Sequence, residues 1–307
     1  MSDSNKIGIG SGHDQGPPRK DFAVVSPTLR RRRLSRLLFQ QREQSGLTAK
    51  AVAAEAKRRS GKARGWSESK INRLETGDWK RLSVDDVYLL LDIYGVTSPS
   101  ERLAYAGLVK EASQKGWWAT YENVLGTGQL IGLEAEASSI RSYQSMTIPG
   151  LLQTGSYARA MAVASAMGET DDVDRRVEAR MLRKAVFSRA NPPAFWTVID
   201  EAALLHITPE LRDQLEYLVE VGHRPNVGIQ VLPVAHGPHA AMTGHFVIME
   251  FPMPDPPLVY LEAVSEELYL ESEEQVRQYK RRFDFVQASA LSVEESRELI
   301  RARLSAL

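Results

Sequence analysis

The segment from Ser67 to Gly77 most constrains how this 307-residue chain can fold, because it has the pattern of a short amphipathic helix closed at both ends. Ser67 is a residue type that accepts hydrogen bonds from the first free N–H groups of a helix, and Gly77 easily adopts the left-handed conformation that ends one. Between them only Ile71 and Leu74 are apolar, and positions three apart share a helix face. The pattern predicts a helix anchored by one narrow face, with its opposite face free.

Four more helices are predicted around this segment, from apolar residues three and four positions apart and from capping residues. The first of the five helices contains the stripe Leu34, Leu37 and Leu38 and ends at Ser45-Gly46, and the second is capped by Thr48 and has Val52, Ala53 and Ala56 on its inner face. The third is Glu68 to Thr76, the fourth runs from Ser83 to Gly95, and the fifth begins at Ser98-Pro99. We therefore predict one all-α domain of five helices over residues 27 to 115. Residues 1 to 26, rich in Gly, Ser and Pro, are predicted to form a flexible tail.

The composition changes after Gly116, where Trp117, Trp118 and Tyr121 follow closely, and the tryptophan pair is interpreted as the seam between two domains. Helical patterns continue, including a predicted helical stretch from Leu133 to Arg141, up to about Arg189. Four runs rich in β-branched and aromatic residues then predict strands, at 195–199, 227–232, 246–251 and 258–262, with helices at 211–221, 274–290 and 293–304. Residues 116 to 307 are therefore predicted to form an α+β domain with a small sheet.

The formal net charge is zero, yet the charges are unevenly distributed along the chain. From Arg30 to Arg81 there are 16 Lys and Arg against 5 Asp and Glu, a net of +11, which leaves 23 against 34, a net of −11, for the rest. A basic module joined to an acidic one is what attraction to nucleic-acid phosphate predicts, and the acidic part disfavours indiscriminate coating of DNA. The alternative is that the basic segment is only a solvated surface.

The polar face of the helix from Glu68 to Thr76 is what a helix-turn-helix requires, because its second helix must present polar groups to the major groove. Glu68, Ser69 and Arg73 are the candidates for base contact, since Arg pairs with guanine O6 and N7 and Glu accepts from cytosine N4. A role in phosphate contact or helix capping is predicted for Thr48, Ser67, Lys70, Lys80 and Arg81. The alternative is a plain helical bundle with solvated polar faces.

The residues Gly46-Leu47-Thr48, Val52-Ala53 and Ser67 to Gly77 resemble the XRE (phage-repressor-like) helix-turn-helix family. The resemblance implies a lambda-repressor-like domain in which Glu75 is buried and pairs with Arg42, because a buried charge needs a partner. These two residues are therefore assigned to structure and not to DNA contact.

One departure from the family pattern is the segment from Lys57 to Gly65, which stands where the family has a turn of a few residues. An exposed loop insertion and an additional phosphate clamp of five cations both fit this segment.

The remainder of the chain is similar to the C-terminal domain of WhiJ-like regulators of actinobacteria. The similarity lies in Gly116-Trp117-Trp118, Leu133 to Ala137, Ile148 to Thr154 and Val231-Leu232-Pro233. It implies an antitoxin-like regulator that acts with a small partner protein, and it supplies no site residue.

Other kinds of chemistry have weaker support in the sequence. The absence of cysteine excludes disulfides and Cys-ligated zinc and fits a reducing compartment. His236, His239 and His245 lie around one loop, but they lack the helical spacing of zinc enzymes, so a solvated loop is favoured over a metal site. The acidic residues that could form a carboxylate pair are interpreted as acidic surface: Glu201, Glu262, Glu266 and Glu267. No catalytic residue, cofactor or metal is predicted, and no enzyme.

We therefore expect a sequence-specific DNA-binding transcription regulator, dimeric on a pseudo-palindromic double-stranded operator, because two half-sites are the usual route to useful specificity. Its C-terminal domain is expected to sense a ligand or bind a small partner protein. The alternative is an antitoxin-like interaction module that sequesters such a partner. No stretch approaches the roughly 18 apolar residues that span a bilayer, so we expect a cytoplasmic protein with no membrane partner.

Overall fold

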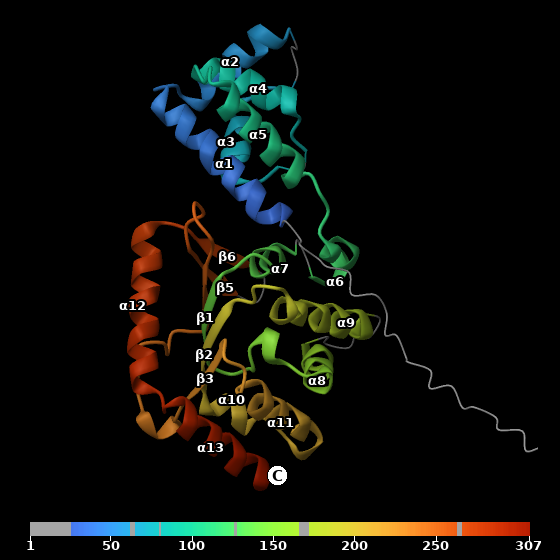
Figure 1. Cartoon of the computed structure of the whole chain (residues 1–307), viewed down its shortest axis with the longest axis vertical. Helices are drawn as coiled ribbons and strands as arrows, with labels where there is room; N and C mark the ends of the chain where they lie inside the picture. Colours follow the sequence, from blue (N-terminus) through green and yellow to red (C-terminus); the bar gives the residue numbers. More distant parts are fainter. Residues whose placement is uncertain (1–25, 62–64, 80, 126–127, 166–171, 263–265) are drawn as a thin grey trace, which may run out of the picture.

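The computed structural model describes residues 26–61, 65–79, 81–125, 128–165, 172–262 and 266–307, and it shows a helical domain followed by an α+β domain (Figure 1). The helical domain contains α1 (Pro27–Gln44), α2 (Ala49–Ser60), α3 (Glu68–Thr76), α4 (Val84–Tyr94) and α5 (Pro99–Ala112). A Ser or Thr side chain caps the first turn of each, namely Ser26, Thr48, Ser67, Ser83 and Ser98. The five predicted helices are confirmed.

One hydrophobic cluster holds the five helices together, with Leu34 and Leu38 of α1, Val52 of α2 and Leu91 of α4 fully buried. Helix α3 joins this cluster through Ile71 and Leu74, which are 1% and 2% exposed. Burying two such side chains stabilises the position of α3 by about 3–6 kcal/mol, since each contributes roughly 1.5–3 kcal/mol. Two apolar residues are therefore enough to orient this short helix.

The C-terminal domain is built on a six-stranded mixed sheet in the order β3-β2-β1-β4-β5-β6. The strands are β1 (Ser139–Gln144), β2 (Ala194–Asp200), β3 (Val227–Leu232), β4 (Phe246–Glu250), β5 (Leu258–Glu262) and β6 (Glu267–Leu270). Strands β1, β2 and β3 are parallel neighbours, and β4, β5 and β6 continue the sheet antiparallel from β1. The α+β class is confirmed, with a larger sheet than the four predicted strands.

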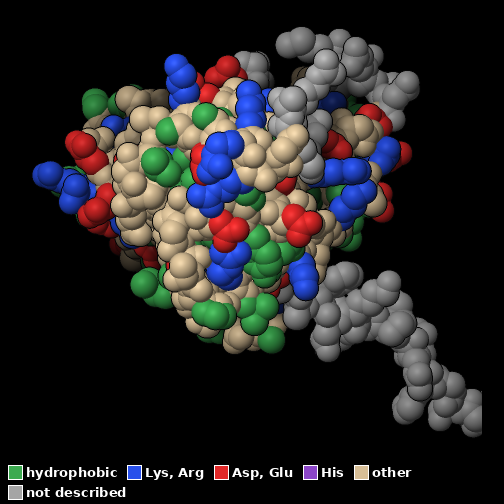
Figure 2. Space-filling model, turned by 90° about the horizontal axis from the view of Figure 1, so that it is seen from above, with side chains coloured by type: hydrophobic (Ala, Val, Ile, Leu, Met, Phe, Trp, Pro, Cys, Tyr) green, Lys and Arg blue, Asp and Glu red, His purple; other side chains and the backbone are tan. Residues whose placement is uncertain are grey.

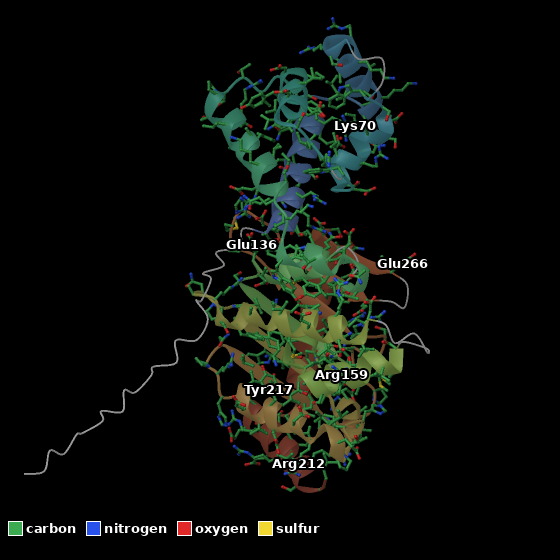
Figure 3. The ribbon with its side chains drawn as sticks, turned by 90° about the vertical axis from the view of Figure 1, so that its right-hand side faces the viewer. Lys70, Glu136, Arg159, Arg212, Tyr217 and Glu266 are labelled. Carbon is green, nitrogen blue, oxygen red and sulfur yellow. The ribbon has the colours of Figure 1, made fainter. Side chains whose placement is uncertain are left out.

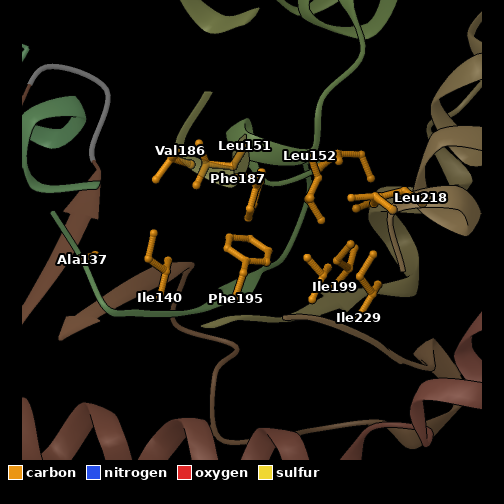
Figure 4. Close-up of a cluster of buried hydrophobic side chains, with 14 of the residues drawn as sticks. Ala137, Ile140, Leu151, Leu152, Val186, Phe187, Phe195, Ile199, Leu218 and Ile229 are labelled. Carbon is orange, nitrogen blue, oxygen red and sulfur yellow. The ribbon is translucent and has the colours of Figure 1, made fainter. Parts of the chain in front are cut away.

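Helices cover both faces of this sheet (Figure 1). The helices of this domain are α6 (Glu122–Leu125), α7 (Gln129–Glu134), α8 (Gly155–Ser165), α9 (Val173–Arg183), α10 (Glu201–Leu205), α11 (Arg212–Val221), α12 (Glu273–Ser289) and α13 (Val293–Ser305). The larger core lies between the sheet and the side of α8 to α11, where Phe195 and Ile199 of β2 face Phe187, Leu151 and Leu218 (Figure 4). A smaller core lies under α12, around Phe283.

The helical stretch predicted from Leu133 to Arg141 is wrong, because α7 ends at Glu134 and β1 begins at Ser139. Strand β1 is central, and its polar residues are satisfied across the sheet: the Ser142 hydroxyl donates to Thr197 Oγ1 of β2 at 2.9 Å. Such partners lie far away in the sequence, so a local pattern does not reveal them. Strand β6 was not predicted either.

The two edges of the sheet have different neighbours. Leu291, just before α13, and Ser296 of α13 both bond to β3: Leu291 N–H donates to Val231 O at 2.9 Å, and Val231 N–H donates to Ser296 Oγ at 2.8 Å. These bonds satisfy backbone groups that an edge strand would otherwise expose. Strand β6 forms the other edge, on the side of the helical domain, and Arg32 of α1 stacks on its Tyr269.

The domain junction is tightly packed around Trp118, which is 5% exposed. A Cβ added at Gly132 of α7 would lie 2.4 Å from Thr28 Oγ1 of α1 and 2.9 Å from the Trp118 ring. Only glycine therefore allows this approach of α1 to α7, with the tryptophan beside both. Trp117 packs edge-on against Trp118, with ring centroids 6.0 Å apart.

Candidate nucleic-acid interface

Helices α2 and α3 pack on each other, and both start at a hydroxyl cap. Thr48 Oγ1 accepts from Ala51 N–H at 3.2 Å, and Ser67 Oγ accepts from Lys70 N–H at 3.1 Å. At the other end of α3, Gly77 has a φ of +82°, a conformation that costs a side-chain-bearing residue energy. The structure thus confirms Thr48 and Ser67 as N-caps and Gly77 as the C-cap.

The outward face of α3 is polar and exposed. Glu68, Ser69 and Arg73, the three residues predicted to contact bases, are all exposed, while Ile71 and Leu74 face the core. Asn72 and Thr76 are exposed beside them, three positions after Ser69 and Arg73 respectively. Asn72 was not among the predicted site residues, although its spacing from Ser69 already placed it on this face and its amide suits adenine N6 and N7.

Lys70 lies at the side of this face and already has partners within the domain. Its Nζ is 3.2 Å from Asp86 Oδ2 of α4 and 3.8 Å from the centroid of the Trp66 ring. A cation held by a carboxylate and an aromatic face contributes to positioning α3 on α4. A phosphate would have to compete with Asp86 for this ammonium group.

Arg42 and Glu75 form a bidentate ion pair between α1 and α3. Arg42 Nε lies 2.7 Å from Glu75 Oε1 and Nη2 lies 3.0 Å from Oε2, and both side chains are buried, at 12% and 7% exposure. Arg42 Nη1 also donates to Leu47 O at 2.9 Å, just before α2. The hydrogen bond to Glu75 raises the pKa of Arg42 above its usual value. The pair therefore ties together three segments of the motif.

The segment after α3 is anchored by Trp79. Its indole Nε1 donates to the buried Ser35 Oγ of α1 at 3.0 Å, and Arg31 stacks on its ring at 5.0 Å. Two positions further on, Arg81 is exposed. Lys80, also predicted to contact phosphate, lies outside the described residues. The anchoring of Trp79 fixes the backbone from which Arg81 extends.

Part of the segment predicted as an expanded turn is helical. Helix α2 continues to Ser60, so Lys57, Arg58 and Arg59 belong to its last turn. Glu55 pairs with Arg58 at 2.5 Å and with Arg59 at 2.6 Å, which holds both guanidinium groups along the helix. The prediction of a loop is therefore wrong for residues 57 to 60. Lys62 and Arg64 lie outside the described residues.

The basic excess between Arg30 and Arg81 is not all directed at solvent. Four arginines of α1 form ion pairs with carboxylates outside this segment: Arg30, Arg32, Arg33 and Arg36. Viewed from the end that carries the helical domain, Lys and Arg side chains stand at several places with Asp and Glu beside them (Figure 2). Net charge along the sequence therefore overstates the charge available to DNA.

The other groups considered from the sequence lie in the C-terminal domain. His239 Nε2 is 3.4 Å from Tyr143 Oη and 3.6 Å from Asp200 Oδ2, while its Nδ1 accepts from Ala241 N–H at 3.2 Å. Among the described residues no three His, Asp or Glu side chains are arranged to bind a metal ion. Glu201 accepts from Val234 N–H at 2.9 Å, which orders the turn after β3.

This arrangement is that of a helix-turn-helix protein, and residues 33–104 match a family model described as a helix-turn-helix domain. Residues 127–302 match the family described as a domain of unknown function, DUF5753, and the chain belongs to that family. No curated protein and no solved structure matches the chain. Within the described residues no helix combines the length and apolar character needed to cross a membrane. The first match indicates DNA-binding regulation, and the second names no role.

Proposed function

We propose that this protein is a sequence-specific DNA-binding transcription regulator that reads the major groove with α3. The observation that carries the proposal is the division of α3 into two faces: Ile71 and Leu74 fix it in the core, while Ser69, Asn72 and Arg73 remain exposed. A recognition helix needs this combination of a rigid inner face and free polar groups. The helix-turn-helix match over residues 33–104 supports the same proposal.

The exposed residues of α3 divide by chemistry into the contacts they can make. Arg73 can read guanine, Asn72 adenine, and Glu68 can accept from cytosine N4. Arg81 and Lys80 follow α3 as long cations suited to phosphate, and the first turn of α2, capped by Thr48, presents backbone N–H groups that also suit phosphate. Lys70 would reach phosphate only by leaving Asp86.

The proposal further includes a homodimer on a pseudo-palindromic operator, because one small helix-turn-helix buries modest area. The resemblance to XRE regulators and to the WhiJ-like regulators of actinobacteria supports this type of protein, acting with a small partner in an antitoxin-like arrangement. The C-terminal domain is assigned ligand sensing or partner binding, and no catalytic step is assigned to it.

The test begins with selection of duplexes from a random pool by the full chain, followed by affinity measurements on the selected and on random sequences. Arg73→Ala is expected to lose about 1–3 kcal/mol on the selected sequence and to relax its base preference. Arg81→Ala is expected to weaken both duplexes alike. Lys110→Ala, an exposed residue of α5 away from this face, serves as the control and should change neither affinity. Equal losses for Arg73→Ala on selected and random DNA would contradict the assignment.

A second candidate function, sequestering a small protein, is favoured by exposed apolar side chains near the C-terminal ends of the parallel strands. Met146, Leu205 and Val234 are 55%, 52% and 55% exposed and lie in the connections that follow β1, β2 and β3. Because these three strands are parallel neighbours, their C-terminal ends lie side by side at one end of the strands. Apolar groups exposed together often mark protein contacts.

This candidate is tested by purifying the tagged full chain from its native cell and identifying any stoichiometric partner. Val234→Glu should abolish recovery of that partner. Leu103→Glu, at a 70% exposed position of α5, should leave its recovery unchanged. Recovery that is equal with both variants would place the contact elsewhere.

A further inference from the structure

Helix α1 packs into both domains. Its residues Leu34 and Leu38 lie in the core of the helical domain, whereas Leu29, 3% exposed, packs with Leu133 and Ile148 in the core of the C-terminal domain. The first half of α1 is therefore a structural part of the junction. The second half of α1 contacts α3 through the Arg42–Glu75 pair.

The junction also contains a buried carboxylate, that of Asp255 in the connection between β4 and β5. Its side chain is only 1% exposed, and it pairs with two arginines of α1. Arg33 binds both carboxylate oxygens, with Nε 2.9 Å from Oδ1, and Arg36 Nη2 lies 3.1 Å from Oδ1. The hydrogen bond to Asp255 raises the pKa of Arg33. Two cations from one domain thus share one buried carboxylate of the other.

Two further arginines extend this contact to either side. Arg32 stacks on Tyr269 of β6 at 5.1 Å and pairs with Glu271, and burial lowers the pKa of Arg32 to about 10. Arg30 pairs with Glu136, just after α7, at 3.0 Å. Figure 3 places Glu136 at the junction, well away from Lys70 on the helical domain.

Charge pairs make up much of this contact, as is common where two domains of one chain meet. The side chains of the four arginines are 13–25% exposed, so water and salt reach the rim of the junction. Pairs at such a rim weaken with salt, whereas loss of one partner of a buried pair leaves the other uncompensated. The charge pairs therefore fix the orientation of the two domains around the apolar contact of Leu29, and their loss is expected to widen the range of orientations.

We propose that Arg30, Arg32, Arg33 and Arg36, paired with Glu136, Asp255 and Glu271, form an electrostatic latch with two consequences. The latch fixes the helix-turn-helix domain on the C-terminal domain, and it keeps the arginines of α1 from binding DNA without sequence preference. Carboxylate oxygens occupy the places at which phosphate oxygens would otherwise bind these guanidinium groups. Only the second consequence rests on the proposed function, because the first concerns the chain without DNA.

The latch itself is tested by distance measurement between the domains. The chain has no cysteine, so Ala104→Cys in α5 and Glu298→Cys in α13, both at exposed positions, accept spin labels cleanly. Pulsed electron spin resonance of the labelled full chain should give one narrow distance distribution, and Asp255→Asn should broaden it severalfold. Asp284→Asn removes the same charge from a 66% exposed carboxylate outside the latch and should leave the distribution unchanged.

A narrow, unshifted distribution in a folded Asp255→Asn protein would overturn the latch. If circular dichroism shows that Asp255→Asn does not fold, Arg36→Gln removes one pair and keeps Arg33 on the carboxylate. An unchanged distribution for Arg36→Gln in 0.5 M salt would then overturn it equally.

The shielding of DNA is tested with a random 20-base-pair duplex and the unlabelled chain. Asp255→Asn should bind this duplex more tightly than the native chain, with a slope of log K against log salt that is steeper by about 1–3, since each neutralised phosphate adds about 0.9. Asp284→Asn should keep the native slope. An unchanged slope alongside a broadened distance distribution would overturn the shielding while the latch stands. Failure of every variant to bind DNA would instead refute the proposed function.

Discussion

Replacing Glu75 by Gln measures how much the buried pair with Arg42 contributes to the motif. The change keeps the shape of the side chain and one acceptor, but it leaves the Arg42 charge, 12% exposed, without its main partner. Breaking a buried pair costs about 3–5 kcal/mol in general. Arg42 retains Leu47 O at 2.9 Å and Glu43 at 2.7 Å, so we expect a loss below this range, about 2–3 kcal/mol.

Hydrogen exchange of the α3 amides, measured by mass spectrometry on the full chain, reports this loss locally. A loss of 2–3 kcal/mol corresponds to exchange about 30- to 150-fold faster, since each 1.4 kcal/mol is tenfold. Glu43→Gln is the matched control, because Glu43 pairs with the same guanidinium group but is 56% exposed. Exposed pairs contribute about 0–1 kcal/mol, so α3 should exchange at most about fivefold faster. Equal factors for the two variants would refute the reasoning that burial makes the Glu75 pair important.

Two other substitutions follow from the junction and the sheet edge. Gly132→Ala should destabilise the protein by about 1–3 kcal/mol in a urea titration, because its Cβ would overlap Thr28. Gly107→Ala in α5 has open space around it and should stabilise the protein by about 0.5–1 kcal/mol. The opposite order of stabilities would show that α1 and α7 are not in close contact. Ser296→Ala should cost about 1–3 kcal/mol, because the buried Val231 N–H loses its acceptor at 2.8 Å, and an unchanged urea midpoint would show that another acceptor replaces it.

The helical domain was predictable because its signals are local. Caps such as Ser67 and Ser83, closing glycines such as Gly77 and Gly95, and apolar residues three and four apart all act within one turn of helix. The same locality explains why the polar face of α3 could be found in the sequence. Asn72 belongs to the same pattern, because it lies three positions after Ser69 and therefore on the same helix face.

The sheet was less predictable where its strands depend on distant neighbours. Strands β2 to β5 are rich in β-branched and aromatic residues, which local reading detects. Strand β1 has the sequence SIRSYQ, in which Ser142 and Arg141 find partners on other strands, at Thr197 and Glu250. No local pattern distinguishes such a strand from a helix.

The domain junction lay beyond sequence reasoning for the same reason. Arg33 and Asp255 are 222 residues apart, and nothing near either residue shows that they meet. The sequence therefore suggested that the whole basic run of α1 was available to phosphate, whereas several of its arginines pair with carboxylates of the C-terminal domain. Composition gave the sign of the charge but not the identity of its partners.

The positions of the two edge strands affect how fragments of this protein would behave. A fragment that begins after α5 keeps the residues that pair with β3 but lacks α1, whose Arg32 stacks on Tyr269 of the edge strand β6 and pairs with Glu271. An exposed strand edge is a template for pairing with another chain. Clustering of such a fragment in solution would then reflect the missing helix, so the number of subunits is best determined on the intact protein.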